Sequence, residues 1–372
     1  MIMENNNRCI QVDFLKLFFC IGVILYHHCM LFFKNDVNLL PFNHFRWIFH
    51  YGSLGVDFFY LSSGFFIHNY YRNIIEKIRL RDFFFKRIKS IYPMYLAVIF
   101  LLMCLFFIDY IFFDNKIYHA RINCWLLVKS VLCISGGWFD GDISPYGMGM
   151  YFVNILFLCY ILYFYLTKKA KTHYILPYII WAIIGFICAT TAKNIPFFYS
   201  RTGRGYLSFA IGVMLCEFTK YSKVDKKQKK FISFSLAMSL AILILCIFRF
   251  GIEPTLGNVW KCFAVIIAPS ILFIFINTSF LSRMFNYLSA RITLINNVGH
   301  YSSSLYFSAS VSMVAIKIIA HFQGIKDFKS KNFFYQTMIF VFIFSLIWDV
   351  IFLKIQKQLK KCNKSGKGEK IT

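Results

Sequence analysis

Long apolar segments recur along the chain and are separated by short polar loops. Most of them contain about 20 residues, the length that a helix needs to cross roughly 30 Å of hydrocarbon. We therefore predict an all-α integral membrane protein, folded as a bundle of about ten transmembrane helices. The predicted spans are residues 12–33, 47–69, 94–113, 149–166, 174–192, 205–219, 231–250, 258–277, 298–320 and 335–355.

Lysine and arginine are concentrated in alternate loops between these spans. The basic segments are 72–93, TKKAK (167–171), KYSKVDKKQKK (220–230) and the C-terminal tail 356–372. Because cytoplasmic loops carry the excess of Lys and Arg, this alternation predicts that both termini are cytoplasmic. The loop KDFKSK (326–331) is basic although this topology places it outside. The segment 123–139 is open to two interpretations, a re-entrant or interfacial helix and a true span, which would reverse everything downstream.

The segment 72–93 mixes charged residues with Ile and Phe at helical spacing. This pattern predicts an amphipathic helix that lies on the cytoplasmic face, with Pro93 starting the third span. The first apolar run follows a short polar head, and no small-residue cleavage site follows the run, so we expect a retained span and not a signal peptide. No repeat or linker divides the chain, and we predict a single transmembrane domain over 1–372 with a basic cytoplasmic tail at 356–372.

Composition narrows the class of protein further. Hydrophobic residues make up 59% of the 372 residues, above the roughly 45–50% of soluble domains. The net charge of +25 could indicate a nucleic-acid partner, but the basic residues lie in the loops where membrane topology places them, so we predict none. The twelve cysteines are scattered without a C-x-x-C pair, and we predict no disulfide framework and no metal site.

Ionisable residues inside the first span carry the first candidate chemistry, because charged groups in hydrocarbon are costly. Lys16 and His27 are eleven residues apart, which places them on one helix face about 16 Å from each other. Asp13 lies one turn before Lys16, and His28 points about 100° away from His27. The alternative interpretation is that both histidines make hydrogen bonds at the interface while Lys16 extends to the cytoplasmic surface.

The second span contains a further acidic residue, Asp57, between Gly55 and Gly64. Small residues allow two helices to approach closely in a membrane. A buried carboxylate in such a place requires a cationic or hydrogen-bonding partner. The first span could provide that partner.

Four motifs occur in order along nearly the whole chain. They are DFLKLFFCIGVILYH (13–27), GVDFFYLSSGFFI (55–67), KRIKSIYPMYL (86–96) and VGHYSSSLYF (298–307). Together they resemble the membrane-bound acyltransferase 3 family, whose members O-acylate carbohydrates of bacterial envelopes. The chain departs from the family pattern at three positions. Lys16 replaces an arginine, Ser90 replaces the second of two arginines, and Ala309 aligns with a frequent histidine.

The resemblance implies a membrane O-acetyltransferase of the bacterial inner membrane. It would transfer acetyl from acetyl-CoA, or another acyl group from its CoA ester, to a hydroxyl of O-antigen, capsule, exopolysaccharide or a lipid-linked precursor. The acyl-CoA is a co-substrate, and no resident cofactor is implied. The alternative function is a flippase or polymerase of the same pathway.

The resemblance also implies roles for individual residues. His27 would act as the general base and Asp57 would orient its imidazole. Lys16 and Arg87 would bind the acyl-CoA, and three further cations could replace the missing family contacts, namely Lys86, Lys89 and Arg204. Arg201 and Arg204 could also bind an anionic acceptor, or simply flank their span.

Overall fold

The computed structural model describes residues 9–33, 50–118, 123–139, 141, 149–170, 175–191, 195–221, 225–250, 256–291, 298–325, 328 and 330–368. These residues form helices and turns, and no strand occurs among them. The main helices are α1 (Ile10–Phe32), α3 (Gly55–Tyr71), α4 (Leu80–Phe113), α5 (Cys124–Val131), α6 (Tyr151–Lys169), α7 (Leu176–Thr191), α8 (Ser200–Cys216), α9 (Lys226–Phe250), α10 (Leu256–Cys262), α11 (Ala268–Asn277), α12 (Ser279–Arg291), α14 (Val298–Phe322) and α15 (Lys331–Gly368). Short helical turns are η3 (Gly52–Leu54), η4 (Ile75–Lys77), η5 (Ser135–Phe139), η6 (Glu217–Tyr221) and η7 (Phe263–Ile267), the last of which joins α10 to α11.

The all-α membrane fold is confirmed. Within the described residues, six helical stretches are long and apolar enough to cross a membrane, in α1, α4, α6, α10 to α11, α14 and α15. Every other predicted span also coincides with a helix, although α3, α7 and α8 have only 17, 16 and 17 residues. The count of ten spans and the cytoplasmic position of both termini stay predictions.

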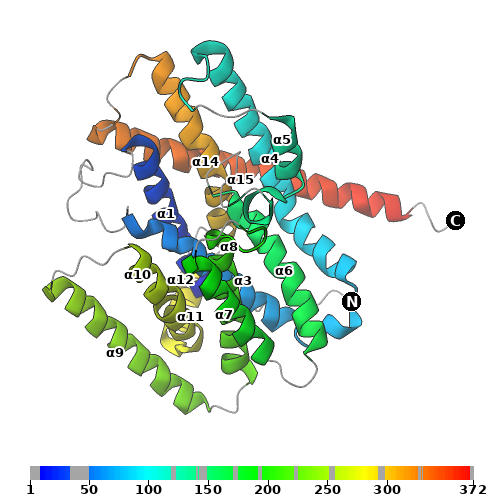
Figure 1. Ribbon diagram of the computed structural model, residues 1–372, viewed down its shortest axis with the longest axis vertical. Helices are drawn as coiled ribbons and strands as arrows, with labels where there is room; N and C mark the ends of the chain where they lie inside the picture. The colour runs from blue at the N-terminus through cyan, green and yellow to red at the C-terminus, as the bar shows by residue number, and fades with distance from the viewer. Residues whose placement is uncertain are drawn as a thin grey trace.

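Helix α3 lies inside the bundle, against α1, α8 and α11 (Figure 1). Its contact with α8 is very close, because Gly64 faces the backbone of Phe209 and Gly212 faces the backbone of Leu61. A β-carbon at either glycine would lie 2.2 or 2.0 Å from a carbonyl oxygen of the other helix. The small residues therefore set the register in which side chains of α3 meet those of α8.

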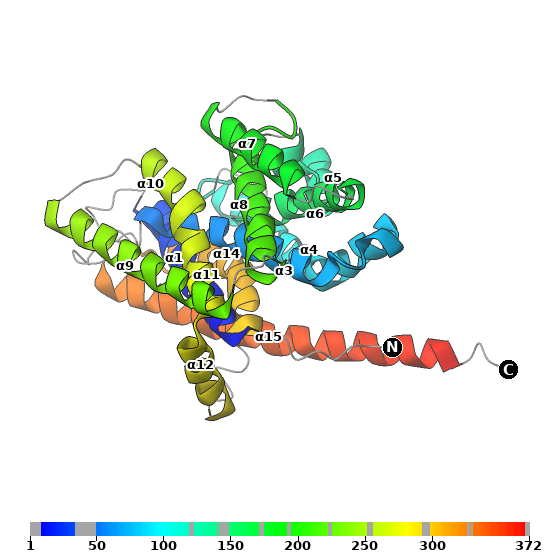
Figure 2. The ribbon, with the colours of Figure 1, turned by 90° about the horizontal axis from the view of Figure 1, so that it is seen from below.

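Helix α1 packs along α14, and α14 packs along α15. The facing residues of α1 and α14 include Cys20, Ile24, Ala309 and Met313, all of which are buried. Seen from below, α15 extends well past the rest of the bundle toward the C-terminus (Figure 2). The predicted basic tail is thus, up to residue 368, a continuation of this last helix.

The prediction of a separate amphipathic helix over 72–93, with a new helix starting at Pro93, is wrong. Helix α4 is continuous for 34 residues and contains Pro93 in its interior. At 1.5 Å per residue it is about 51 Å long, more than the roughly 30 Å of hydrocarbon. The basic residues 80–93 and the third span are therefore one rod, and only residues 72–79 form a separate turn. A proline is tolerated within a membrane helix because neighbouring groups can satisfy the freed carbonyl.

The structure also excludes a full span for 123–139. Helix α5 has eight residues, about 12 Å of helix, and the chain then turns at Gly136 and Gly137, whose backbone is not helical. This segment is tied to its neighbours, since the Tyr95 hydroxyl donates to the Ser130 carbonyl at 2.8 Å and the Trp138 indole donates to the Asn154 carbonyl at 2.9 Å. The spans before and after this segment can therefore keep the predicted alternation of cytoplasmic and external loops.

Candidate active site

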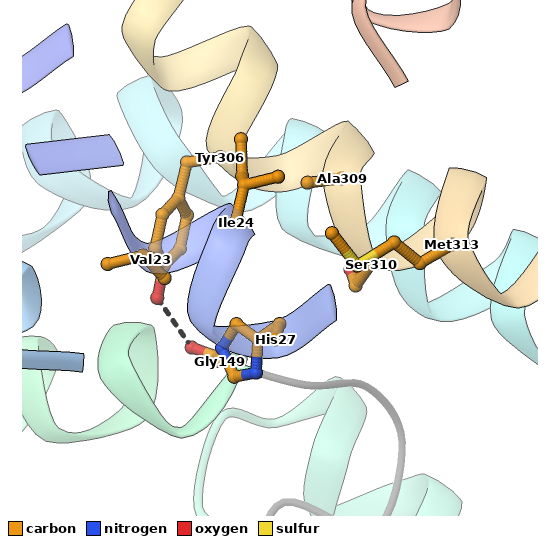
Figure 3. Close-up of a pocket in the computed structure, with 8 residues that line it drawn as sticks. All are labelled: Val23, Ile24, His27, Gly149, Tyr306, Ala309, Ser310 and Met313. Carbon is orange, nitrogen blue, oxygen red and sulfur yellow. Dashed lines mark hydrogen bonds between the residues drawn. The ribbon is translucent and has the colours of Figure 1, made fainter. Parts of the chain in front are cut away.

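His27 lines a small cavity between α1 and α14. The other lining residues are Val23, Ile24, Gly149, Tyr306, Ala309, Ser310 and Met313. Figure 3 shows the imidazole beside Gly149, with Tyr306 on one side and the Ser310 and Met313 side chains on the other. The three-and-four-residue spacing of 306, 309, 310 and 313 places them on the face of α14 that meets α1. The predicted polar face of the first span therefore ends at a cavity.

Gly149 lies beside both the His27 imidazole and the Tyr306 hydroxyl. Its φ of +78° is a conformation that favours glycine, and a β-carbon there would lie 3.7 Å from His27 Nε2 and 3.0 Å from the Tyr306 hydroxyl oxygen. That hydroxyl donates to the Gly149 carbonyl at 2.9 Å, as the dashed line in Figure 3 marks. His27 Nδ1 is buried and has no hydrogen-bond partner among the described residues. Nε2 is thus the nitrogen that faces the open space.

His28 faces a different environment, as the helical spacing predicts. It is fully buried, and its ring centroid lies 4.7 Å from that of Phe32 and 5.0 Å from that of Phe334. Neither ring nitrogen has a hydrogen-bond partner within the part of the chain that the structure describes. His28 therefore packs between α1 and α15, away from the cavity that His27 lines.

Asp57 does not bind His27, which corrects the predicted contact between them. Its carboxylate forms a bidentate ion pair with Arg204 of α8 and accepts hydrogen bonds from Ser208 at 3.4 Å and from the Trp260 indole at 3.3 Å. Arg204 and Ser208 are one turn apart and precede Gly212 on the same face of α8. The close α3–α8 contact at the glycines thus aligns Asp57 with Arg204.

A second cavity lies beside this ion pair. It is lined by Val56, Asp57, Tyr60, Tyr151, Arg201 and Arg204. The Arg201 guanidinium lies 4.6 Å from the centroid of the Tyr151 ring, and Arg201 is close enough for its charge to act on the His27 imidazole. Five of its six lining residues have polar side chains, so we call it the polar cavity. It is narrower than the first and leaves no room for a water-sized group. The first cavity is lined largely by apolar residues.

The other predicted binding residues lie near the opposite end of α3. Lys16 is 3.6 Å from Asp13, and its ammonium is 4.9 Å from the centroid of the Phe66 ring. Arg87 donates to the Tyr71 hydroxyl at 2.6 Å, and its guanidinium also lies over that ring.

Lys16 of α1 and Arg87 of α4 form a basic group with two lysines of α4. Lys86 donates to the Tyr70 hydroxyl at 3.0 Å, and Lys89 is exposed. Asp57 and Tyr71 are fourteen residues apart, about 21 Å of helix. The structure therefore separates Arg204 from the other four predicted binding cations, so Arg204 does not replace a lost contact of that group.

Several residues of the site are missing from the sequence prediction. Tyr306 lies within the family motif VGHYSSSLYF, which could have indicated it as a candidate. Gly149, Tyr151 and Trp260 belong to no motif, and only the packing of α6 and α10 against α3 and α8 brings them to the site. For Arg201 the sequence permits acceptor binding or a flanking position, and the structure places it in the lining of the polar cavity.

Comparison with known proteins gives one match. A family model described as an acyltransferase domain matches residues 10–352, nearly the whole chain. Neither a curated protein nor a solved structure matches. The matched range includes every residue that lines the two cavities.

Proposed function

This chain belongs to the membrane-bound acyltransferase 3 family, and we propose that it is an O-acetyltransferase of the bacterial cell envelope. The donor is acetyl-CoA, and the acceptor is a hydroxyl of a cell-surface polysaccharide or of its lipid-linked precursor. The protein resides in the inner membrane with both termini in the cytoplasm. That it is a multi-pass membrane acyltransferase follows from the family and the helices; the donor, the acceptor and the membrane are our proposal.

The observation that carries this proposal is that His27 lines a small, largely apolar cavity and lies near Arg201, one of the polar residues that line the second cavity. An acyl transfer to an alcohol needs a base beside the point where an apolar acyl group meets a polar hydroxyl compound. Imidazole is suited to this task, since its ordinary pKa of about 6.5 lets it accept and return a proton near neutral pH.

The reaction balances with His27 as the only proton carrier. His27 Nε2 takes the proton of the acceptor hydroxyl while its oxygen attacks the thioester carbonyl carbon. The carbon–sulfur bond then breaks, the ester is released, and the CoA thiolate takes the proton from the imidazolium. Asp57 has no direct part in these steps, because its oxygens are bound by Arg204, Ser208 and Trp260.

The basic group at the other end of α3 is proposed to bind the donor. Lys16, Lys86, Arg87 and Lys89 lie where a cytoplasmic CoA ester would arrive in the predicted topology, and cations bind phosphate oxygens strongly. The axial rise from Lys16 to His27 is about 16 Å. The long pantetheine arm of CoA would extend along α1 and present the thioester to His27.

The acceptor is proposed to bind at the residues of the polar cavity, which has to open to admit it. Arg201 and Tyr151 offer donors and an aromatic face to a carbohydrate, and the Asp57–Arg204 pair fixes the wall behind them. His27 lies at the end of α1 opposite Lys16, so the transfer would take place near the extracytoplasmic side.

Label transfer tests the proposal. Cells that lack the chromosomal gene are complemented with the intact chain, and their membranes receive acetyl-CoA labelled in the acetyl group. We expect label in the envelope glycan fraction, released by mild base as acetate. A flippase or polymerase would leave the glycan unlabelled, and that outcome would overturn the proposal.

A further inference from the structure

The cavity beside His27 has apolar walls, although a base for an alcohol borders it. Val23 and Ile24 of α1 face Ala309 and Met313 of α14 across it, and all four are buried. Figure 3 shows Val23 beside Tyr306, Ile24 on α1 with the imidazole, and Ala309 and Met313 on α14. These apolar walls require an explanation, because the hydroxyl that His27 would deprotonate belongs to a polar acceptor.

The two hydroxyls in the cavity are directed elsewhere. Tyr306 donates to the Gly149 carbonyl at 2.9 Å, and Ser310 donates to the Phe307 carbonyl at 3.4 Å. A sugar ring placed here would lose its hydrogen bonds to water and find few partners, at a cost of a few kcal/mol for each unpaired group. A hydrocarbon group would lose nothing, since the walls match it.

The cavity is also small. Its described walls leave room for about one water-sized group. The methyl of an acetyl group is close to that size, whereas each further methylene would have to displace a buried side chain. Ile24 and Met313 are 3% and 1% exposed and pack among Cys20, Leu305 and Val341, so they have little freedom to move away.

We propose that this cavity binds the acyl group of the donor, and that Ile24 and Met313 restrict that group to acetyl. The inference rests on the proposed function and adds the residues that select the acyl length. The carbonyl carbon lies at His27 and the methyl points toward Met313. The acceptor then approaches from the polar cavity, on the side of Arg201.

A donor series tests this inference. Membranes receive acetyl-, propionyl-, butyryl- or hexanoyl-CoA labelled in the acyl group, and the rate of label entry into glycan is measured for each. The wild-type rate should fall at least about tenfold from acetyl to butyryl, since one surplus methylene in a tight pocket costs about tenfold or more. Met313→Ala and Ile24→Ala should raise the butyryl-to-acetyl rate ratio about tenfold.

Matched variants separate selection from general damage. Leu305→Ala truncates the same buried cluster without lining the cavity, and it should leave the rate ratio unchanged. Ala309→Leu should fill the cavity and lower the acetyl rate. Ile24→Val and Met313→Val give smaller shifts in the same direction if an alanine variant does not accumulate in the membrane.

Two results would overturn the inference. One is a wild-type protein that transfers butyryl as fast as acetyl. The other is an unchanged rate ratio in membrane-inserted variants at both Ile24 and Met313. A wild-type protein that transfers none of the four acyl groups would instead refute the proposed function.

Discussion

The Asp57 carboxylate is bound by Arg204, on a neighbouring helix, and not by His27. Asp57 is 1% exposed and Arg204 is 22% exposed, so this pair lies at the edge of the protein interior. Two further donors, Ser208 and Trp260, complete the shell of the carboxylate. The acid therefore fixes one wall of the polar cavity, and the His27 imidazole has no carboxylate partner among the described residues.

The ion pair can be tested by removing its members singly and together. Asp57→Ala and Arg204→Met each leave one uncompensated charge, which costs about 3–5 kcal/mol in a buried pair. We expect both single variants to accumulate poorly and the double variant to accumulate better than either. Detergent-solubilised protein in a thermal-unfolding assay measures this. Additive losses in the double variant would mean that the two residues are not coupled.

Gly149 gives a second prediction, because a β-carbon there would contact His27 Nε2 and crowd the Tyr306 hydroxyl. Gly149→Ala should lower acetyl transfer about tenfold or more while costing roughly 1–2 kcal/mol of stability through its positive φ. Gly324→Ala is the matched control, with φ of +68° and no described atom within 4 Å of the added carbon. Equal activity in the two variants would show that the space before Nε2 is not needed.

Donor binding is expected to depend on Lys16 and Arg87. Lys16→Ala and Arg87→Ala should raise the apparent KM for acetyl-CoA, or abolish turnover, without changing the dependence on acceptor. Lys16→Arg should be tolerated, since the charge is kept. Arg87→Lys should be impaired, because a lysine cannot both donate to Tyr71 and keep a planar stack on its ring.

The control for the donor prediction is Lys116→Ala. Lys116 is an exposed lysine that pairs with Asp114 beyond the far end of α4. It should not change the KM for acetyl-CoA. If Lys16→Arg is as inactive as Lys16→Ala, the alignment of α1 with the family is mistaken.

The topology provides a fourth prediction. A cytoplasm-active reporter fused at Asp225 should be active, and Phe198→Cys should react with a membrane-impermeant thiol reagent added from outside. Phe198 is 42% exposed before α8, and Asp225 is exposed before α9, so both sites are accessible. The unchanged chain, with its own cysteines, gives the background of labelling. If both sites are found on the same side of the membrane, the predicted alternation of cytoplasmic and external loops is refuted.

The directions of the side chains in the first span could be predicted from the sequence, because they follow the 3.6-residue repeat of a single helix. The 3.6-residue repeat places Lys16 and His27 on one face and turns His28 away, and the different surroundings of His27 and His28 agree. That reasoning needs no knowledge of the neighbouring helices.

The partner of Asp57 could not be predicted in the same way. Which residue pairs with Asp57 depends on the register of α3 against α8. Gly64 and Gly212 set this register through contacts between helices, which no local sequence pattern indicates. The prediction of a helix start at Pro93 failed for a related reason, since proline favours a helix start in water but is tolerated within a membrane helix. The short helix α12 was not predicted, because its residues carry no long apolar run.

The central claim is that His27 is the base of acetyl transfer, and acetyl transfer by two neighbouring variants tests it most directly. His27→Ala and His28→Ala are compared at equal amounts of membrane-inserted protein, using labelled acetyl-CoA and the envelope glycans of the complemented cells. We predict that His27→Ala loses at least about 100-fold in rate, the typical contribution of a general base, and that His28→Ala keeps substantial activity. Equal losses in both variants, or a His27→Ala protein with more than about a tenth of the wild-type rate, would contradict the account.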